Sequence, residues 1–369
     1  MRILYFSRDC TPHDHRFLTA LAKTAHEVYF LRFEKAYHVV EDRPLPPEIE
    51  LVEWDGGRRK AEFQDFPHYL GDLRKILHRL KPDLVHAGPI QRSAFLTALV
   101  GFRPLVSMSW GYDLLHDATI NPFYRWATRY TLRRSSALVG DCKTIRQLAV
   151  SYGMPDERIV TFPWGVDIQH FNVDTCKHSN FPTFNLLSTR GFEPIYGIDV
   201  IARAFVIAAR HRPELHLTML GSGSQENDIR RIFLVGDVFD RVHFAGQVPY
   251  VDLPRCYQES DIYISASHSD GSSISLLEAF ATGTPAIVSD IPGNQEWITP
   301  GENGWLFRDG DAEGLASAIL TALDRREMLA AMGRNARRVA EDRADWSKNF
   351  PLLEQAYSIA MKSTSQLRA

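Results

Sequence analysis

The sequence predicts an α/β fold of two Rossmann-like domains, each built on a parallel sheet. The first observation is that short apolar runs alternate with helical patterns along almost all of the 369 residues. Such alternation is typical of parallel strands joined by right-handed helical crossovers. The second is that the alternation comes in two blocks, separated by a stretch without periodicity at Phe171–Thr183. A chain of this length also fits about two domains.

Thirteen apolar runs are the expected strands. Between the third and fourth runs, apolar residues recur at helical spacing from Phe66 to Leu80, and Lys81-Pro82 ends this helix because proline cannot continue its hydrogen bonds. From Ala312 onward the pattern is helical. The expected strands are Ile3–Phe6, Val28–Phe33, Ile49–Trp54, Leu84–Ala87, Leu105–Ser109, Ala137–Gly140, Ile159–Phe162, Phe184–Ser188, Leu215–Leu220, Val242–Ala245, Ile262–Ala266, Ala286–Ser289 and Trp305–Phe307.

Composition excludes several classes of protein. With 44% apolar and 24% charged residues, the chain is neither disordered nor fibrous. A net charge of −3 gives no overall attraction for nucleic acid. The most apolar stretch, 93–110, contains Arg103-Pro104 and is too short for a membrane span. The four cysteines form no Cys-x-x-Cys pair, and no export signal is evident, so we expect a cytoplasmic protein without a zinc or redox motif.

The loops that follow the expected strands are rich in glycine, charge and indole. Ligands of open parallel sheets bind at the carboxyl ends of the strands. If the two sheets face each other, both sets of loops line one cleft. The loops are 8–16, 110–113 and 163–167 in the first block, and 190, 221–223, 246–248, 267–273 and 290–293 in the second.

The loop and helix at 268–285 carry the most information. Gly271 allows a ligand to approach the backbone, and Ser272 or Ser273 can cap the helix that follows. The amide groups at such a helix start favour an anion such as a diphosphate. Glu278, about two turns further on, is placed to accept hydrogen bonds from a ribose. The alternative is a capped helix with a solvated glutamate.

The segment Asp270–Gly293, with seven residues between Asp270 and Glu278, resembles a signature of the retaining glycosyltransferases that include sucrose-phosphate synthase and bacterial mannosyltransferases, that is, glycosyltransferase family 4-like proteins. The resemblance implies a GT-B fold, in which two Rossmann-like domains face a central cleft. We therefore expect an acceptor-binding domain over 1–172, a nucleotide-sugar-binding domain over 173–345, and a final helix over 346–369 that crosses back. The resemblance continues at 165–167 with Phe171, 197–199, 220–223 and 303–306.

In the second domain, the resemblance implies a donor site. Glu278 would bind the ribose, and Arg190 would clamp the diphosphate, whose oxygens suit a guanidinium fork. Asp270 stands where the family usually has glutamate, and Tyr196 stands where it usually has lysine. An alternative for Arg190 is a surface arginine. The other expected donor contacts are Gly221, Val248 at the base, and Gly271, Ser272, Ser273 and Ile274 at the diphosphate or sugar.

In the first domain, the residues leave alternatives open for the expected sugar contacts. His13 or Asp14 would touch the acceptor or donor sugar, although a helix-capping loop explains them equally well. Trp110 stands where many family members have histidine, and Asp113 could accept a sugar hydroxyl in its place. Trp110 and Trp164 could stack on a sugar face, or pack in the core.

We expect no metal and no cofactor, because the nucleotide sugar is itself the substrate. Asp309-Gly310-Asp311 fits a metal-binding pattern of transferases of another fold, but a turn with Asp311 as helix N-cap explains it. His13-Asp14-His15 lacks an evident third ligand residue for zinc. The helix over Phe123–Arg134 has one aromatic and one basic face, and it would either pack on its own sheet or lie at the inner face of a membrane.

The resemblance implies a retaining hexosyltransferase that uses a UDP- or GDP-sugar, and we expect it to act without a metal ion. The acceptor would be a cell-envelope saccharide, a glycolipid or a small hydroxylated metabolite. Retention could proceed by a same-face reaction or by a covalent intermediate, and the residues do not separate the two. The alternatives are a sugar-nucleotide epimerase or phosphorylase of the same architecture, or a non-catalytic partner subunit, which Tyr196, Trp110 and Asp270 would favour.

Overall fold

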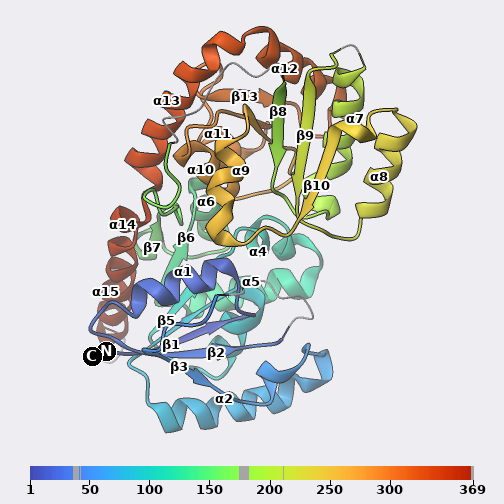
Figure 1. Cartoon of the computed structure of the whole chain (residues 1–369). Coiled ribbons are helices and arrows are strands. Elements are labelled where there is room, and N and C mark those ends of the chain that lie inside the picture. Colours follow the sequence, from blue (N-terminus) through green and yellow to red (C-terminus); the bar gives the residue numbers. More distant parts are fainter. Residues whose placement is uncertain (36–40, 42, 174–182, 211, 367–369) are drawn as a thin grey trace. The chain divides into compact units, whose positions relative to one another are not determined.

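The structure, a computed structural model, describes residues 1–35, 41, 43–173, 183–210 and 212–366. The chain divides into two compact units (Figure 1). The first unit comprises residues 1–163 and 350–369, and the second comprises residues 164–349. Both are α/β units with a parallel sheet, as the sequence predicts.

The first unit contains a seven-stranded parallel sheet with the order β3-β2-β1-β4-β5-β6-β7. All seven expected strands of this unit are confirmed to within two residues at each end. Their residues are mostly buried, because helices cover a parallel sheet on both faces. The bounds are β1 Arg2–Ser7, β2 Glu27–Arg32, β3 Ile49–Val52, β4 Leu84–Ala87, β5 Leu105–Met108, β6 Ala137–Gly140 and β7 Ile159–Thr161.

The second unit contains a six-stranded parallel sheet with the order β10-β9-β8-β11-β12-β13. The six expected strands of this unit are also confirmed. Adjacent residues of β8 point to opposite faces of the sheet: Leu186 joins the hydrophobic core on one face, and Leu187 joins a separate core on the other. The bounds are β8 Phe184–Ser188, β9 Leu215–Leu220, β10 Val242–Gly246, β11 Ile262–Ser265, β12 Ala286–Ser289 and β13 Gly304–Phe307.

The helices follow the strands in the expected alternation. The helix predicted over 66–80 is α2, Phe66–Leu80, and it ends where Lys81 adopts a φ of 47°. The other helices of the first unit are α1 Pro12–Leu21, α3 Phe95–Leu99, α4 Tyr112–Leu115, α5 Pro122–Arg134, α6 Lys143–Ser151 and α15 Pro351–Gln366. Those of the second unit are α7 Ile198–Ala209, α8 Glu226–Val235, α9 Leu253–Gln258, α10 Ile274–Ala281, α11 Pro292–Gln295, α12 Ala312–Asp324, α13 Leu329–Val339 and α14 Trp346–Asn349.

The units divide at 163/164 and 349/350, whereas the sequence predicted 172/173 and 345/346. Residues 164–173 belong to the second unit, because the Val166 amide donates to the Ala344 carbonyl at 2.7 Å and the Phe171 ring is fully buried in the core of that unit. The expected linker, 171–183, lies mostly outside the described residues, since 174–182 are not described.

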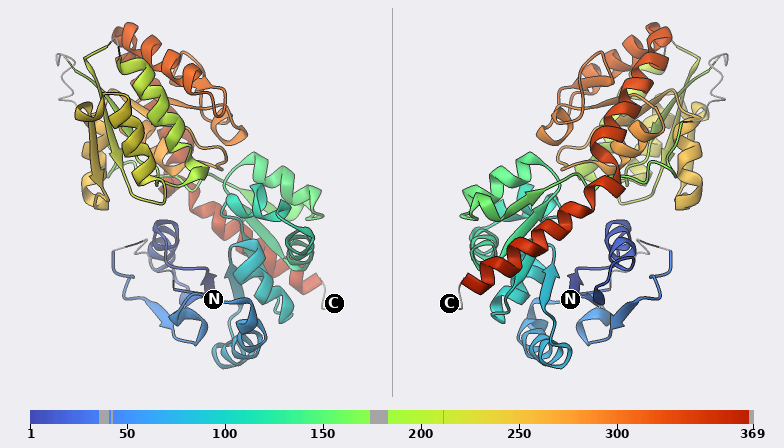
Figure 2. Two further views of the ribbon diagram at one scale, coloured as in Figure 1. Left: turned by 90° about the vertical axis from the view of Figure 1, so that its right-hand side faces the viewer. Right: turned by 90° about the vertical axis from the view of Figure 1, so that its left-hand side faces the viewer.

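The final helix, α15, belongs to the first unit, where it lies along β5, β6 and β7 (Figure 2). Its Tyr357 hydroxyl lies 2.9 Å from Nδ1 of His86 on β4, and both side chains are fully buried. Among the residues that the structure describes, none of the helices combines the length and the apolar character that crossing a membrane requires.

Each strand order reverses direction at one point, between β1 and β4 in the first unit and between β8 and β11 in the second. Open α/β sheets bind ligands outside the carboxyl ends of the strands at such a reversal. In the second unit, the residues that leave β8 and β11 at this edge include Arg190 and Asp270.

Candidate functional site

Arg190 and the start of α10 meet at the strand reversal of the second unit. Arg190 follows β8, and its Nη1 donates to Oγ of Ser273 and Oγ of Ser275, both at 3.2 Å. Its Nη2 lies 2.8 Å from Oδ2 of Asp270. The guanidinium also stacks over the ring of Tyr196 at 4.2 Å. The structure therefore brings together four residues that the sequence assigned to one donor site.

The environment keeps Arg190 charged. Burial by itself lowers the pKa of a guanidinium, but the adjacent Asp270 carboxylate, together with nearby tyrosine hydroxyls, outweighs it, and the pKa of Arg190 is raised. Only 13% of the side chain is exposed. Arg190 is thus a charged group held in a fixed place by partners on three sides.

A glycine-rich loop after β9 supports the loop that carries Arg190. Gly221 has a φ of 108°, and a side chain there would start 3.2 Å from the Arg190 carbonyl oxygen. The Phe192 amide donates to the Ser222 carbonyl at 3.0 Å, and a Cβ at Gly223 would lie 2.6 Å from the Phe192 carbonyl. Gly221, an expected donor contact, therefore has a direct role in positioning Arg190.

Ser273 is the N-cap residue of α10, one of the two residues that the sequence proposed. Its hydroxyl does not cap the helix, however, and instead accepts the hydrogen bond from Arg190. Ser272, immediately before it, is 6% exposed. The start of α10 thus joins an amide-rich helix terminus to a guanidinium, and both groups attract anions.

Glu278 lies on α10 and is 8% exposed. Its Oε2 accepts a hydrogen bond from the Tyr257 hydroxyl at 2.8 Å, and that hydroxyl also lies 3.1 Å from Oγ1 of Thr189. Burial and the adjacent Glu278 charge raise the pKa of Tyr257 well above its usual value, so Tyr257 remains a donor. Glu278 is consequently held by the protein, not solvated as the alternative reading expected.

Three residues of this cluster were missed at the level of sequence. Tyr263 donates to Oγ of Ser275 at 2.8 Å, and Ser275 in turn accepts from Arg190. Tyr257 holds Glu278. Tyr263 stands in an apolar run and Tyr257 in a polar segment, and an aromatic ring in either setting is usually a core residue, so only their buried hydroxyls could have signalled a polar role.

The remaining expected donor contacts lie nearby in the chain but have structural roles of their own. Val248 follows Gly246 and is packed at the edge of the core that includes Tyr257, as is Ile274. The Gly271 carbonyl would lie 2.3 Å from a Cβ at Gly293, so the start of α11 fits tightly against the loop that carries Asp270.

In the first unit, Asp14 is fully buried and holds the start of α1. Its Oδ2 accepts from the Thr11 amide at 2.8 Å, and its Oδ1 accepts from the Tyr5 hydroxyl at 3.0 Å. Thr11 caps the helix in return, which gives a capping box. Burial raises the pKa of Asp14 to about 6. These contacts favour the helix-capping interpretation of this loop.

Asp113 is likewise buried, with 2% exposure, and it holds the loop after β5 together. Its Oδ1 accepts from Ser109 at 2.6 Å and from the Leu114 amide at 2.9 Å, and its Oδ2 accepts from the Ile90 amide at 2.9 Å. Burial raises the pKa of Asp113 to about 6. The contacts favour a positioning role over direct contact with a sugar hydroxyl.

The two indoles differ in environment. Trp110 is partly exposed, and its ring centroid lies 5.4 Å from that of His13, so these two expected site residues lie together in the first unit. Trp164 belongs to the second unit and is only 3% exposed, which favours core packing.

The aspartates of the metal-binding pattern at 309–311 make other contacts. Asp311 is the N-cap of α12 and accepts from the Gly314 amide at 2.9 Å, as the sequence predicts. Asp309 pairs with Nδ1 of His268 at 2.7 Å. Within the described ranges, the one group of three potential ligands is Asp55, His68 and Asp72, at the surface and away from the expected site residues in the sequence.

The aromatic face of α5 is partly exposed, with Phe123 at 48% and Trp126 at 49%. Both rings also contact Phe95 edge-on, with centroids at 6.1 and 5.6 Å, so the helix packs on its own unit through the same face. Membrane contact through this helix stays a prediction.

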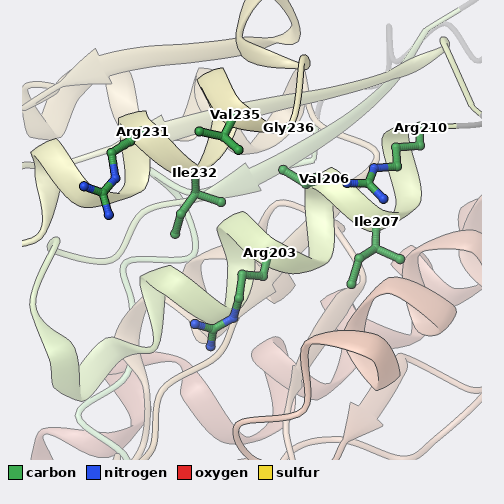
Figure 3. A pocket seen from close by; sticks show the side chains of 8 residues that line it. All are labelled: Arg203, Val206, Ile207, Arg210, Arg231, Ile232, Val235 and Gly236. Carbon is green, nitrogen blue, oxygen red and sulfur yellow. The ribbon is translucent and has the colours of Figure 1, made fainter.

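A further groove lies between α7 and α8, and none of its lining residues is an expected site residue (Figure 3). Arginines surround its apolar floor, and Gly236 allows the two helices to approach closely. The lining residues are Arg203, Val206, Ile207, Arg210, Arg231, Ile232, Val235 and Gly236.

Comparison with known proteins identifies relatives of this chain. The chain is 28% identical over 168 residues to the GtfA subunit of the UDP-N-acetylglucosamine–peptide N-acetylglucosaminyltransferase of Streptococcus pneumoniae, a match that covers 45% of this chain and 32% of that protein. It is 27% identical over 373 residues to a D-inositol 3-phosphate glycosyltransferase of Pseudarthrobacter chlorophenolicus, covering 93% and 88%. The matches span 32%, 43% and 58% of the first three curated relatives.

Two solved structures share the fold. Sucrose-phosphate synthase of Thermosynechococcus elongatus has a TM-score of 0.81 at 17% identity, with 97% of this chain and 98% of that chain covered. Anabaena HepE, determined in complex with UDP-glucose, has a TM-score of 0.78 at 19% identity, with 97% and 100% covered.

Two family matches together cover most of the chain. Residues 13–165 match the family described as "Glycosyl transferase 4-like domain". Residues 182–339 match the family described as "Glycosyl transferases group 1". With two parallel Rossmann-like sheets and a guanidinium at the strand reversal of the second, the chain belongs to the GT-B glycosyltransferases of the family 4-like type.

Proposed function

We propose that this chain transfers a hexose-type sugar from a nucleotide diphosphate sugar to a hydroxyl acceptor, with retention of configuration and without a metal ion. The observation that carries the proposal is the meeting of Arg190 with Ser273 at the start of α10, at the strand reversal of the second unit. A leaving diphosphate gains negative charge as the glycosidic bond breaks, and fixed positive groups stabilise that charge as it develops.

Each donor residue has a distinct task in this proposal. Arg190 and the amide groups of the first turn of α10 bind the diphosphate, and Glu278 accepts hydrogen bonds from the ribose. Tyr196 supplies an aromatic surface for the guanidinium, a contact worth about 0.5–2 kcal/mol when partly desolvated. This contact, which the sequence does not show, supports Tyr196 as a positioning residue in the place where the family usually has lysine.

We expect the donor to be a sugar conjugate of UDP or GDP. Relatives of this chain support each of the two nucleotides: one is named as a UDP-N-acetylglucosamine–peptide N-acetylglucosaminyltransferase subunit, and another as a GDP-mannose-dependent mannosyltransferase. For the acceptor we propose a cell-envelope saccharide, a glycolipid or a small hydroxylated metabolite. His13 and Trp110 are the proposed acceptor contacts, and Asp14 and Asp113 hold their loops in place.

For retention we propose a same-face reaction. A non-bridging oxygen of the leaving diphosphate takes the acceptor proton while the acceptor oxygen bonds to the same face of the anomeric carbon. No carboxylate nucleophile is then required, in contrast to retaining hydrolases.

A binding and turnover screen tests the proposal. The full chain is titrated calorimetrically with UDP, GDP and ADP and with their glucose, mannose and N-acetylglucosamine conjugates, and donor hydrolysis is followed for each. We expect one of the three nucleoside diphosphates to bind, and its sugar conjugate to be hydrolysed slowly. Binding without turnover in the presence of candidate acceptors would instead favour a partner subunit, and conversion of the sugar without an acceptor would favour an epimerase.

Chelation is expected to leave this turnover unchanged. Arg190 and the helix terminus supply the positive charge that a metal ion provides in metal-dependent transferases. Turnover is measured after treatment with EDTA, and again after magnesium or manganese is added. Loss of turnover that either ion restores would contradict metal independence and direct attention to Asp309 and to Asp55, His68 and Asp72.

A further inference from the structure

We propose that Asp270 is an internal competitor of the donor: its carboxylate and the diphosphate compete for the same edge of the Arg190 guanidinium. This inference rests on the proposed function and adds a regulatory role at the same site. In this role, Asp270 sets how tightly the diphosphate is held, and it releases Arg190 when a diphosphate arrives.

The first support is the geometry of the ion pair. Nη2 of Arg190 lies 2.8 Å from Oδ2 of Asp270, which is within contact distance for opposite charges. Nevertheless, this oxygen has no hydrogen-bond partner among the described residues, so no N–H of Arg190 is well aimed at it. Charge attraction without an aligned hydrogen bond is weaker than a two-point guanidinium–oxyanion contact.

The second support is the incomplete satisfaction of the guanidinium itself. Nη1 has two acceptors, Ser273 and Ser275, but Nε of Arg190 is buried without a hydrogen-bond partner in the described part of the chain. A buried donor without an acceptor is unfavourable, because it has lost its hydrogen bond to water without gaining another. A diphosphate, with several oxygens at different angles, can satisfy donors that a single poorly aligned carboxylate oxygen leaves open.

The third support is that the rest of the cluster holds Arg190 in place while this edge exchanges partners. Tyr263 donates to Ser275 at 2.8 Å and so directs the lone pairs of Ser275 toward Nη1. The ring of Tyr196 holds the guanidinium plane from one side. Among the described residues, the Nη2 contact is the one that involves a second charge, so a diphosphate that approaches this edge competes with Asp270 and is repelled by it.

The competition can be measured as nucleotide affinity. UDP and GDP are titrated calorimetrically into the full chain, in the wild type and in Asp270→Asn and Asp270→Ala. We expect both variants to bind the nucleoside diphosphate about tenfold more tightly than the wild type. The two variants are needed together, because the asparagine amide could itself donate to a phosphate, whereas alanine only removes the competing charge. Thermal unfolding shows whether each variant is folded.

The matched control is Asp324→Asn, which removes a carboxylate from another arginine–aspartate pair. Asp324 is 63% exposed and lies 2.7 Å from Nη1 of Arg212, at the end of α12. It changes the net charge of the protein by the same amount as Asp270→Asn. Tightening in this control would mean that general charge, not competition for Arg190, governs affinity.

The outcomes separate this inference from the proposed function. If the wild type binds a nucleoside diphosphate and the Asp270 variants bind it equally or more weakly, the competition is overturned while the donor site stands. Such a result would mean that Asp270 positions Arg190 for the diphosphate. If no nucleoside diphosphate binds the wild type or either variant, the proposed function fails, and this inference fails with it.

Discussion

Replacing Arg190 with alanine is expected to lower turnover of the nucleotide sugar by about 100- to 1000-fold. Removal of one fixed donor to a developing negative charge costs about 3–4 kcal/mol in enzymes that stabilise an oxyanion. Arg190 is the charged donor at the strand reversal of the second unit, and it is held by Ser273, Ser275 and Tyr196. The measurement is kcat and KM for the donor that the binding screen identifies.

Two variants separate this loss of charge from damage to the fold. Arg190→Ala leaves Asp270 without its cation, so the double variant Arg190→Ala/Asp270→Asn removes the pair together and should be as inactive as the single variant but more stable. Arg231→Ala, at an exposed position on α8 in the groove of Figure 3, is the matched control and should retain full turnover. Normal turnover of Arg190→Ala would reassign the diphosphate clamp to another group.

The strands could be predicted from the sequence because parallel strands are covered on both faces. Such strands appear as continuous apolar runs, and all thirteen predicted runs are strands. The domain boundary was less accessible. The pairing of Val166 with residues near Ala344 joins positions almost 180 residues apart, and no local pattern signals it.

Single site residues could be assigned, but their partners could not. Arg190 and Ser273 were placed in one site because the family resemblance implies that both meet the diphosphate, and because both follow expected strands. That Asp270 and Tyr196 would both contact the guanidinium depends on side-chain directions across three loops. For Asp14 and Asp113, a polar loop after a strand suggests a ligand contact, whereas the structure shows buried carboxylates that satisfy backbone amides.

Replacing Glu278 with glutamine is expected to weaken binding of the nucleoside diphosphate by about ten- to 100-fold. Hydrogen bonds to a charged group contribute about 1.5–3 kcal/mol, and glutamine keeps the shape of the side chain while removing its charge. Calorimetry with UDP or GDP measures the loss. Parallel titration with inorganic pyrophosphate should show no change, because pyrophosphate has no ribose for Glu278 to bind.

Tyr257→Phe tests whether Glu278 acts as a positioned acceptor. The tyrosine hydroxyl donates to Oε2 of Glu278 at 2.8 Å, so its removal takes away this hydrogen bond but keeps the charge of the carboxylate. We expect a smaller loss of nucleotide affinity than in Glu278→Gln, again without an effect on pyrophosphate. Glu259→Gln, which removes an exposed carboxylate paired with Arg255, is the matched control and should bind as the wild type does.

If Glu278→Gln weakens pyrophosphate and nucleotide binding equally, Glu278 supports the diphosphate site as a whole and the ribose contact is lost from the proposal. A loss confined to the nucleotide requires Glu278 to act on the nucleoside part of the donor, since pyrophosphate shares every other group.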